Sequence, residues 1–171
     1  MVASVRSAVS VGTVLMAVMC LFASAAAAHA QVVTGSVKDE RGDYLPGVSG
    51  DPADIKRLSF RFDENVGELV IRFTLYRPAP STALPEAGAV CDQGFVDVRG
   101  SFAIIAVGEP PFPTVPVDLD LRGKQVVLRA SDPLLAQLGC REAGGSINGS
   151  GGPTDGSLDS VSPFPLRETG H

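Results

Sequence analysis

The chain has 171 residues, of which 44% are hydrophobic and 19% charged, and it carries a formal net charge of −5. This length allows one domain of ordinary size, with two very small domains as the alternative. The acidic balance argues against nucleic-acid binding, because proteins that neutralise many phosphates are usually basic.

The first thirty residues have the pattern of a secretory signal peptide. Arg6 lies near the start, no charged residue occurs from Ala8 to Ala28, and Ala28-His29-Ala30 offers the small residues of a cleavage site. The uncharged stretch is also long enough to span a bilayer, but the small residues that follow it favour cleavage. We therefore expect residues 1–30 to be removed, which leaves no membrane span and places the protein outside the cell or in the periplasm.

Export would leave few of the side chains that catalysis commonly uses. The only histidine after residue 30 is the terminal His171, and the chain has no G-x-S-x-G, H-E-x-x-H or phosphate-loop motif. A nucleophilic triad or a zinc site is therefore not expected. Carboxylate chemistry of the glycosidase type stays open, although the chain lacks tryptophan for a sugar platform. The sequence predicts a protein that is not an enzyme.

Alternation of apolar and polar residues predicts strands through most of the chain. The clearest pair is a hairpin of residues 58–62 and 69–75 around the turn 63–67. Further strands are expected at residues 32–37, 95–99, 102–107, 118–121 and 125–130. The strand at 102–107 is apolar on both faces, which favours a central place in its sheet. About seven short strands predict an all-β protein, an antiparallel β-sandwich.

The segments between and after these strands differ in composition. Asp132 as a cap, Pro133 and the following residues to Gly139 predict one short C-terminal helix. The proline-rich stretches 77–88 and 109–116 are expected to be loops or edge crossings. From Glu142 onward glycine, serine and proline dominate, so residues 142–171 are expected to form a flexible tail after a domain of residues 31–141.

Two cysteines remain beyond the proposed cleavage site, Cys91 and Cys140. An even pair in an exported domain predicts a structural disulfide. Closing a loop of about 50 residues would stabilise the fold by about 4 kcal/mol in the chain-entropy account.

An acidic segment precedes the strongest hairpin. Its carboxylates at Asp39, Asp43 and Asp54 are candidate ligands for calcium, which takes six to eight oxygen ligands from flexible loops. The alternative is a solvated acidic loop, and the spacing differs from that of an EF-hand.

The same region carries a resemblance to known exported modules. It is similar to the family-nine carbohydrate-binding modules and the DOMON-like sandwiches in a set of positions comprising Asp39, Gly42, Asp43, Asp54, Ile55, Asp63 and the strand Leu69–Tyr76. The resemblance implies an immunoglobulin-like or jelly-roll-like sandwich, often supported by calcium, that binds sugars or haem. This chain has no tryptophan for sugar stacking and, beyond residue 30, no methionine for haem.

The leading hypothesis is a secreted, non-enzymatic β-sandwich with a binding or structural role at the cell surface or in the medium. Its partner would be an extracellular protein or glycan. A calcium-supported carbohydrate-binding module is the second hypothesis, and it predicts Tyr44 or Tyr76 exposed beside a groove. A further alternative is an inhibitor or effector that presents the loop Glu109–Pro116 to another protein.

Overall fold

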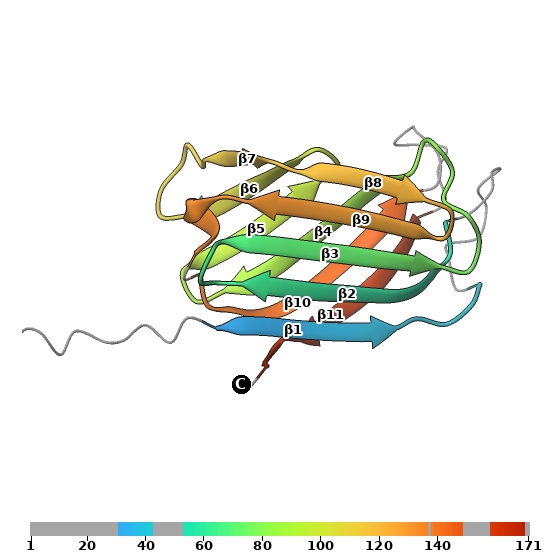
Figure 1. Cartoon of the computed structure of the whole chain (residues 1–171), viewed down its shortest axis with the longest axis horizontal. Coiled ribbons are helices and arrows are strands. Elements are labelled where there is room, and N and C mark those ends of the chain that lie inside the picture. The colour runs from blue at the N-terminus through green and yellow to red at the C-terminus, as the bar shows by residue number, and fades with distance from the viewer. Residues whose placement is uncertain (1–30, 43–52, 137, 149–157, 170–171) are drawn as a thin grey trace, which may run out of the picture.

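The computed structural model describes residues 31–42, 53–136, 138–148 and 158–169. Their strands form two antiparallel sheets of six strands, packed face to face (Figure 1). The predicted all-β sandwich is confirmed, with twelve strands where about seven were expected. The proposed signal peptide, residues 1–30, lies outside the described residues.

The first sheet, called sheet A here, has the strand order β12-β1-β2-β3-β9-β8. Its strands are β1 (Val32–Lys38), β2 (Ile55–Asp63), β3 (Glu68–Leu75), β8 (Asp118–Arg122), β9 (Gln125–Ser131) and β12 (Arg167–Glu168). The second sheet, sheet B, has the order β11-β10-β4-β5-β6-β7. Its strands are β4 (Leu84–Cys91), β5 (Gly94–Arg99), β6 (Phe102–Val107), β7 (Thr114–Pro116), β10 (Cys140–Asn148) and β11 (Leu158–Pro165).

The three predicted hairpins are all present, as β2–β3, β5–β6 and β8–β9. In the β2–β3 turn, Asp63 accepts hydrogen bonds from the backbone and side chain of Asn65. Burial opposes ionisation of Asp63, but the Asn65 hydrogen bonds and the charge of Arg61 outweigh it and hold its pKa below the ordinary value. Gly67 ends the turn at φ 65°, where a Cβ would lie 2.2 Å from the carbonyl oxygen of Asp132.

Part of the core joins large side chains on sheet A to small ones on strands β4 and β10 of sheet B. Sheet A contributes chiefly phenylalanine, leucine and isoleucine, including Phe60, Phe62 and Phe73. The facing strands β4 and β10 contribute mainly small residues, namely Ala87, Ala89, Ala143 and Gly145. Large residues opposite small ones fill the space between two layers without voids.

This size asymmetry explains where the sequence analysis was wrong. Residues 84–91 were expected to lie partly in a proline-rich loop, and residues 142–171 in a flexible tail. Instead they contain β4, most of β10, and β11 and β12. Alanine and glycine give a weak hydrophobic alternation, but every second residue of β4 is buried. The domain therefore does not end at residue 141. Residues 149–157 lie outside the described residues.

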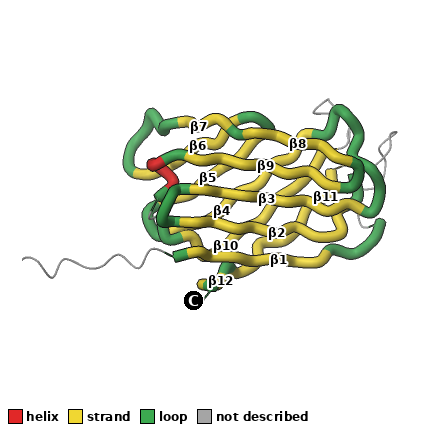
Figure 2. The backbone as a smooth tube through the Cα atoms, in the orientation of Figure 1, coloured by secondary structure: helices red, strands yellow, loops and turns green. Residues whose placement is uncertain are grey.

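The predicted C-terminal helix was also wrong. Asp132 does cap a turn, since its carboxylate accepts from the Leu134 amide at 2.8 Å. However, the turn is a 3₁₀ segment over Pro133–Leu135 that Ala136 ends in an extended conformation (Figure 2). The strand 102–107 lies next to the edge strand β7 rather than at the centre of sheet B.

The predicted disulfide joins Cys91, the last residue of β4, to Cys140, the first residue of β10, with an S–S distance of 2.06 Å. These residues are direct cross-strand partners, so the bond links the middle of sheet B to the chain that returns from sheet A. The sequence separation of 49 corresponds to about 4 kcal/mol of stabilisation in the chain-entropy account.

The C-terminal segment crosses from one sheet to the other. After β11 in sheet B, the chain packs over Gly35 of β1, where a Cβ would lie 2.8 Å from the Pro165 carbonyl oxygen. It then adds β12 beside β1. Phe164 meets Phe60 edge to face across the core, with ring centroids 6.1 Å apart. The C-terminal residues thereby close one side of the sandwich.

Two buried carboxylates tie sheet A to sheet B. Asp159 of β11 accepts from the Ile55 amide at 2.5 Å, and Glu64 accepts from the Cys140 amide at 3.1 Å. Both acidic residues are buried. Each amide lies at a place where the ladder register shifts, between Ile55 and Arg57 in β2 and between Cys140 and Glu142 in β10. The carboxylates thus satisfy amides at irregular points of the two ladders.

Replacing Asp159 with alanine should lower the free energy of unfolding by about 2–3 kcal/mol, because the buried Ile55 amide loses its acceptor. Urea unfolding measures this change. The matched control Asp118→Ala, at an exposed position of β8, should stay within about 0.5 kcal/mol of the unchanged protein. Equal effects of the two substitutions would contradict the integration of β11 into the core.

Candidate functional site

A β-bulge at the start of β2 determines which side chains face solvent at one end of sheet A. The register shifts between Ile55 and Arg57. Ile55 and Leu58 are both buried, while the two residues between them, Lys56 and Arg57, are both exposed. Regular alternation would turn one of these two side chains inward. The bulge turns both cations toward solvent.

Neighbouring strands add further cations to this surface. Lys38 of β1 is the direct cross-strand partner of Arg57. Arg72 of β3 pairs with Ser59, one outward step along β2 from Arg57. We call Lys38, Lys56 and Arg57 the basic cluster, and Arg72 lies one row away from it. Among the described residues, none of these four has an ion-pair partner closer than 4 Å.

Arginines elsewhere on the described surface are more often paired. Arg61 contacts Asp63 and Glu68, each at 3.1 Å. Arg99 contacts Asp97 at 2.8 Å, and the hydrogen bond and charge of Asp97 raise the pKa of Arg99. Arg122 and Arg141 have carboxylate partners too. The basic cluster lacks the carboxylate partners that these four arginines have, and among the other described residues Arg129 and Arg167 lack them too.

The basic cluster borders a hollow of about 600 Å³. Its lining comprises Lys38, Asp39, Lys56, Arg57, Thr74 and Tyr76. These side chains come from the end of β1, the start of β2 and the end of β3, which lie side by side in sheet A. Three cations, one acidic residue, a hydroxyl and an aromatic ring thus line one space.

Tyr76 is fixed in place from several sides. Its hydroxyl donates to the Asp39 carbonyl oxygen at 3.2 Å, and its amide donates to the Asp54 carbonyl oxygen at 2.9 Å. The Arg41 guanidinium carbon lies 5.8 Å from the ring centroid, and the Lys56 ammonium nitrogen lies 5.9 Å from it. Both distances are within the range of cation–π contacts. The ring therefore holds cations at the rim of the hollow.

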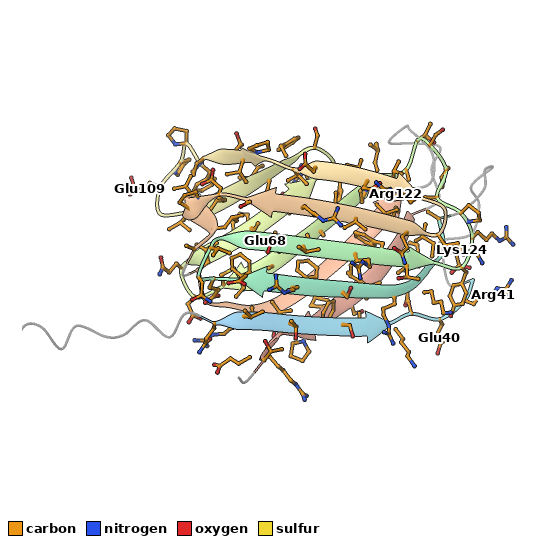
Figure 3. The ribbon with its side chains drawn as sticks, viewed as in Figure 1. Glu40, Arg41, Glu68, Glu109, Arg122 and Lys124 are labelled. Carbon is orange, nitrogen blue, oxygen red and sulfur yellow. A yellow bond between two sulfur atoms is a disulfide. The ribbon has the colours of Figure 1, made fainter. Side chains whose placement is uncertain are left out.

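Charge is distributed unevenly along the sandwich. In Figure 3, Arg41, Lys124 and Arg122 lie at the end where β1 and β3 end, and Glu40 lies there beside Arg41. Glu109 lies at the opposite end. That opposite end of sheet A also carries acidic residues beside the β2–β3 and β9–η1 turns, namely Asp63, Glu64, Glu68 and Asp132. The end of sheet A with the hollow thus gathers several cations, together with the carboxylates of Asp39 and Glu40.

The predicted calcium ligands are only partly brought together. Asp39 lines the hollow, and Asp54 is buried behind it, where its carboxylate accepts from the Gly42 amide at 3.3 Å. Asp43 lies outside the described residues. Within the described ranges, no group of three or more histidine, cysteine or acidic side chains has a geometry suited to a metal ion. Calcium binding stays a prediction.

The structure also locates Tyr76 and the proline-rich loop 109–116, which the sequence analysis named as candidate binding features. Tyr76 lies beside a hollow but is half-buried, whereas the second hypothesis expected it to be exposed, and Tyr44 falls outside the described residues. In the loop 109–116, Phe112 meets Phe95 of β5 edge to face at 6.4 Å, and Thr114–Pro116 forms the edge strand β7. No helix in the described part of the chain has the length and apolar character needed to cross a bilayer.

The sequence analysis missed the basic cluster. A signal was present, because Ile55 and Leu58 are separated by two polar residues where strict alternation requires one. Such a slip at the start of a strand indicates a bulge, and here both intervening residues are cations. The pairing of Lys38 with Arg57 could not be foreseen, because it depends on the β1–β2 register across a long connection.

Comparisons of this chain with protein-family models, with curated proteins and with solved structures find no match. The resemblance to family-nine carbohydrate-binding modules and DOMON-like sandwiches therefore stays a prediction. Any function assigned to this end of sheet A is supported by the geometry and charge of its own residues.

Replacing Lys38 with glutamine should raise the free energy of unfolding by about 0.5 kcal/mol at low salt, because like charges directly opposite in a sheet repel. The gain should shrink as salt screens the pair. Urea unfolding at two salt concentrations measures both effects. A loss of stability on substitution would show that Lys38 has a stabilising partner.

The midpoint of thermal unfolding should be the same with added calcium as with a chelator. The hollow is lined by cations that repel a divalent ion, and Asp54 already accepts a backbone hydrogen bond. Magnesium at the same concentration controls for ionic strength. A rise specific to calcium would show that Asp39, Asp54 and Asp43 form a site.

Proposed function

We propose that the protein is an exported, non-enzymatic binding module that holds an anionic ligand at the basic cluster. The hollow is lined by three cations from β1 and β2, the Thr74 hydroxyl, the ring of Tyr76 and one acidic residue, Asp39, so cations outnumber carboxylates there. Charge-assisted hydrogen bonds from arginine and lysine to carboxylate, sulfate or phosphate are among the stronger polar contacts in proteins. The role is binding or structural, with no reaction on the ligand.

The observation that carries the proposal is the pairing of Lys38 with Arg57 next to the outward bulge at Lys56. A sheet surface is more stable with opposite charges in these positions. Here like charges face each other and lack ion-pair partners among the described residues. Departures from local stability rules concentrate at functional sites. An anion bound between the cations would relieve the repulsion.

Export is part of the proposal. The disulfide between Cys91 and Cys140 supports it, because such bonds persist mainly in oxidising compartments. The signal-peptide pattern of residues 1–30 supports it from the sequence.

A protein-binding role is the second candidate, and one contact favours it. Phe112 in the proline-rich loop packs on Phe95, which is 48% exposed on the outer face of sheet B. Val90, the cross-strand partner of Phe95, is 60% exposed. Aromatic residues in exposed apolar patches are typical of protein contacts.

The proposal is tested by titrating the secreted, oxidised protein with sodium sulfate while recording backbone amide signals by NMR. Sodium chloride at equal ionic strength is the reference. Signals of Lys38, Lys56, Arg57 and Thr74 should shift to saturation, because sulfate accepts charge-assisted hydrogen bonds from these cations.

Lys56→Gln combined with Arg57→Gln should abolish these shifts. The control combination Arg99→Gln with Arg141→Gln removes the same charge from arginines paired to Asp97 and Asp92, and it should leave the shifts unchanged. Shifts that are absent, or that scatter over the whole surface, would refute an anion site at this end of sheet A.

A further inference from the structure

We infer that the anionic ligand is an acidic polysaccharide that lies along the outer face of β1, β2 and β3. This inference rests on the proposed function and names the ligand class of the same site. Its basis is a second hollow of about 350 Å³ on the same face, lined by Thr34, Ser36, Ser59, Arg61, Val70 and Arg72 among others.

The strand register makes the two hollows neighbours. Lys38, Arg57 and Thr74 form one outward row across the three strands, and Ser36, Ser59 and Arg72 form the next. Adjacent outward rows are about 7 Å apart along a strand. The face is therefore a continuous track rather than a single pocket.

Hydroxyl and guanidinium groups mix along this track. Each row contains at least one serine or threonine hydroxyl, and the first two rows contain cations without ion-pair partners among the described residues. In the third row Thr34 pairs with Arg61, whose guanidinium contacts Asp63 and Glu68. A hydroxyl both donates and accepts hydrogen bonds, as sugar hydroxyls do. A guanidinium group can bind carboxylate or sulfate through two parallel hydrogen bonds, in a bidentate manner. Together they match a chain that bears many hydroxyls and periodic anions.

Other polyanions fit this face less well. A single-stranded nucleic acid needs open aromatic faces on which its bases stack, and the Tyr76 ring already holds Arg41 and Lys56. A membrane surface needs apolar side chains to insert. Val70, half-buried, is the one apolar side chain among the outward residues of the three rows.

The test measures binding of two acidic polymers to the secreted, oxidised protein by calorimetry. Polygalacturonate carries carboxylates, heparin carries sulfates as well, and dextran is the neutral reference. One or both acidic polymers should bind and dextran should not. The stronger of the two identifies the anionic group that the track prefers.

Arg72→Gln separates this inference from the proposed function, because Arg72 lines the track and not the hollow beside Tyr76. The substitution should weaken polymer binding about tenfold and leave the sulfate shifts at Lys56 unchanged. Arg72→Lys should restore part of the affinity. The control Arg99→Gln, on sheet B, should bind polymer as the unchanged protein does. Equal thermal midpoints would show that each variant is folded.

Three outcomes would overturn the inference. If neither polymer binds while sulfate still shifts Lys56, the polysaccharide is wrong and the anion site stands. If sulfate has no effect either, both proposals fall. If single-stranded DNA or anionic lipid vesicles bind as tightly as the polymers, the track recognises charge alone.

Discussion

Both ends of β2 are tied to the opposite sheet by a buried carboxylate, and the surface at one end of sheet A depends on that arrangement. Asp159 accepts from the Ile55 amide where β2 begins, and Glu64 accepts from the Cys140 amide just after β2 ends. A buried amide without an acceptor costs about 1–3 kcal/mol. Asp159 therefore makes the register shift beside Ile55 tolerable, and that shift exposes both Lys56 and Arg57.

The basic cluster shows how a stable scaffold can carry an unfavourable surface. Large side chains on sheet A pack on small ones on β4 and β10 of sheet B, and the Cys91–Cys140 bond restrains the unfolded chain. Those contributions exceed the repulsion between Lys38 and Arg57, which amounts to less than about 1 kcal/mol for such a pair. A rigid sheet holds the cations at fixed spacing, so little side-chain freedom remains to be lost when an anion binds. Proteins commonly lose some stability at a surface whose residues serve a function.

The sequence predicted those parts of the fold whose residues differ strongly in hydrophobicity. The β2–β3 hairpin was recognisable because leucine, isoleucine and phenylalanine alternate with polar residues, and the cysteine pair followed from its even count. Strands β4 and β10 were missed because alanine and glycine give little contrast, and β11 was missed because it contains two prolines and follows a glycine-rich stretch. Asp39 and Asp54 were found for their charge, and they do lie near the hollow. Lys38 and Arg57 were missed because only the tertiary register makes them neighbours.

The most direct test of the two buried ties is hydrogen exchange of individual backbone amides in the native protein. If Asp159 and Glu64 hold both ends of β2, the Ile55 and Cys140 amides should exchange only on global unfolding, as slowly as the amide of Ile71 in the core strand β3. If either amide exchanges as fast as the amide of the exposed turn residue Asn65, its hydrogen bond to the carboxylate does not hold in the native protein. The outward orientation of Lys56 and Arg57 would then lose its structural basis.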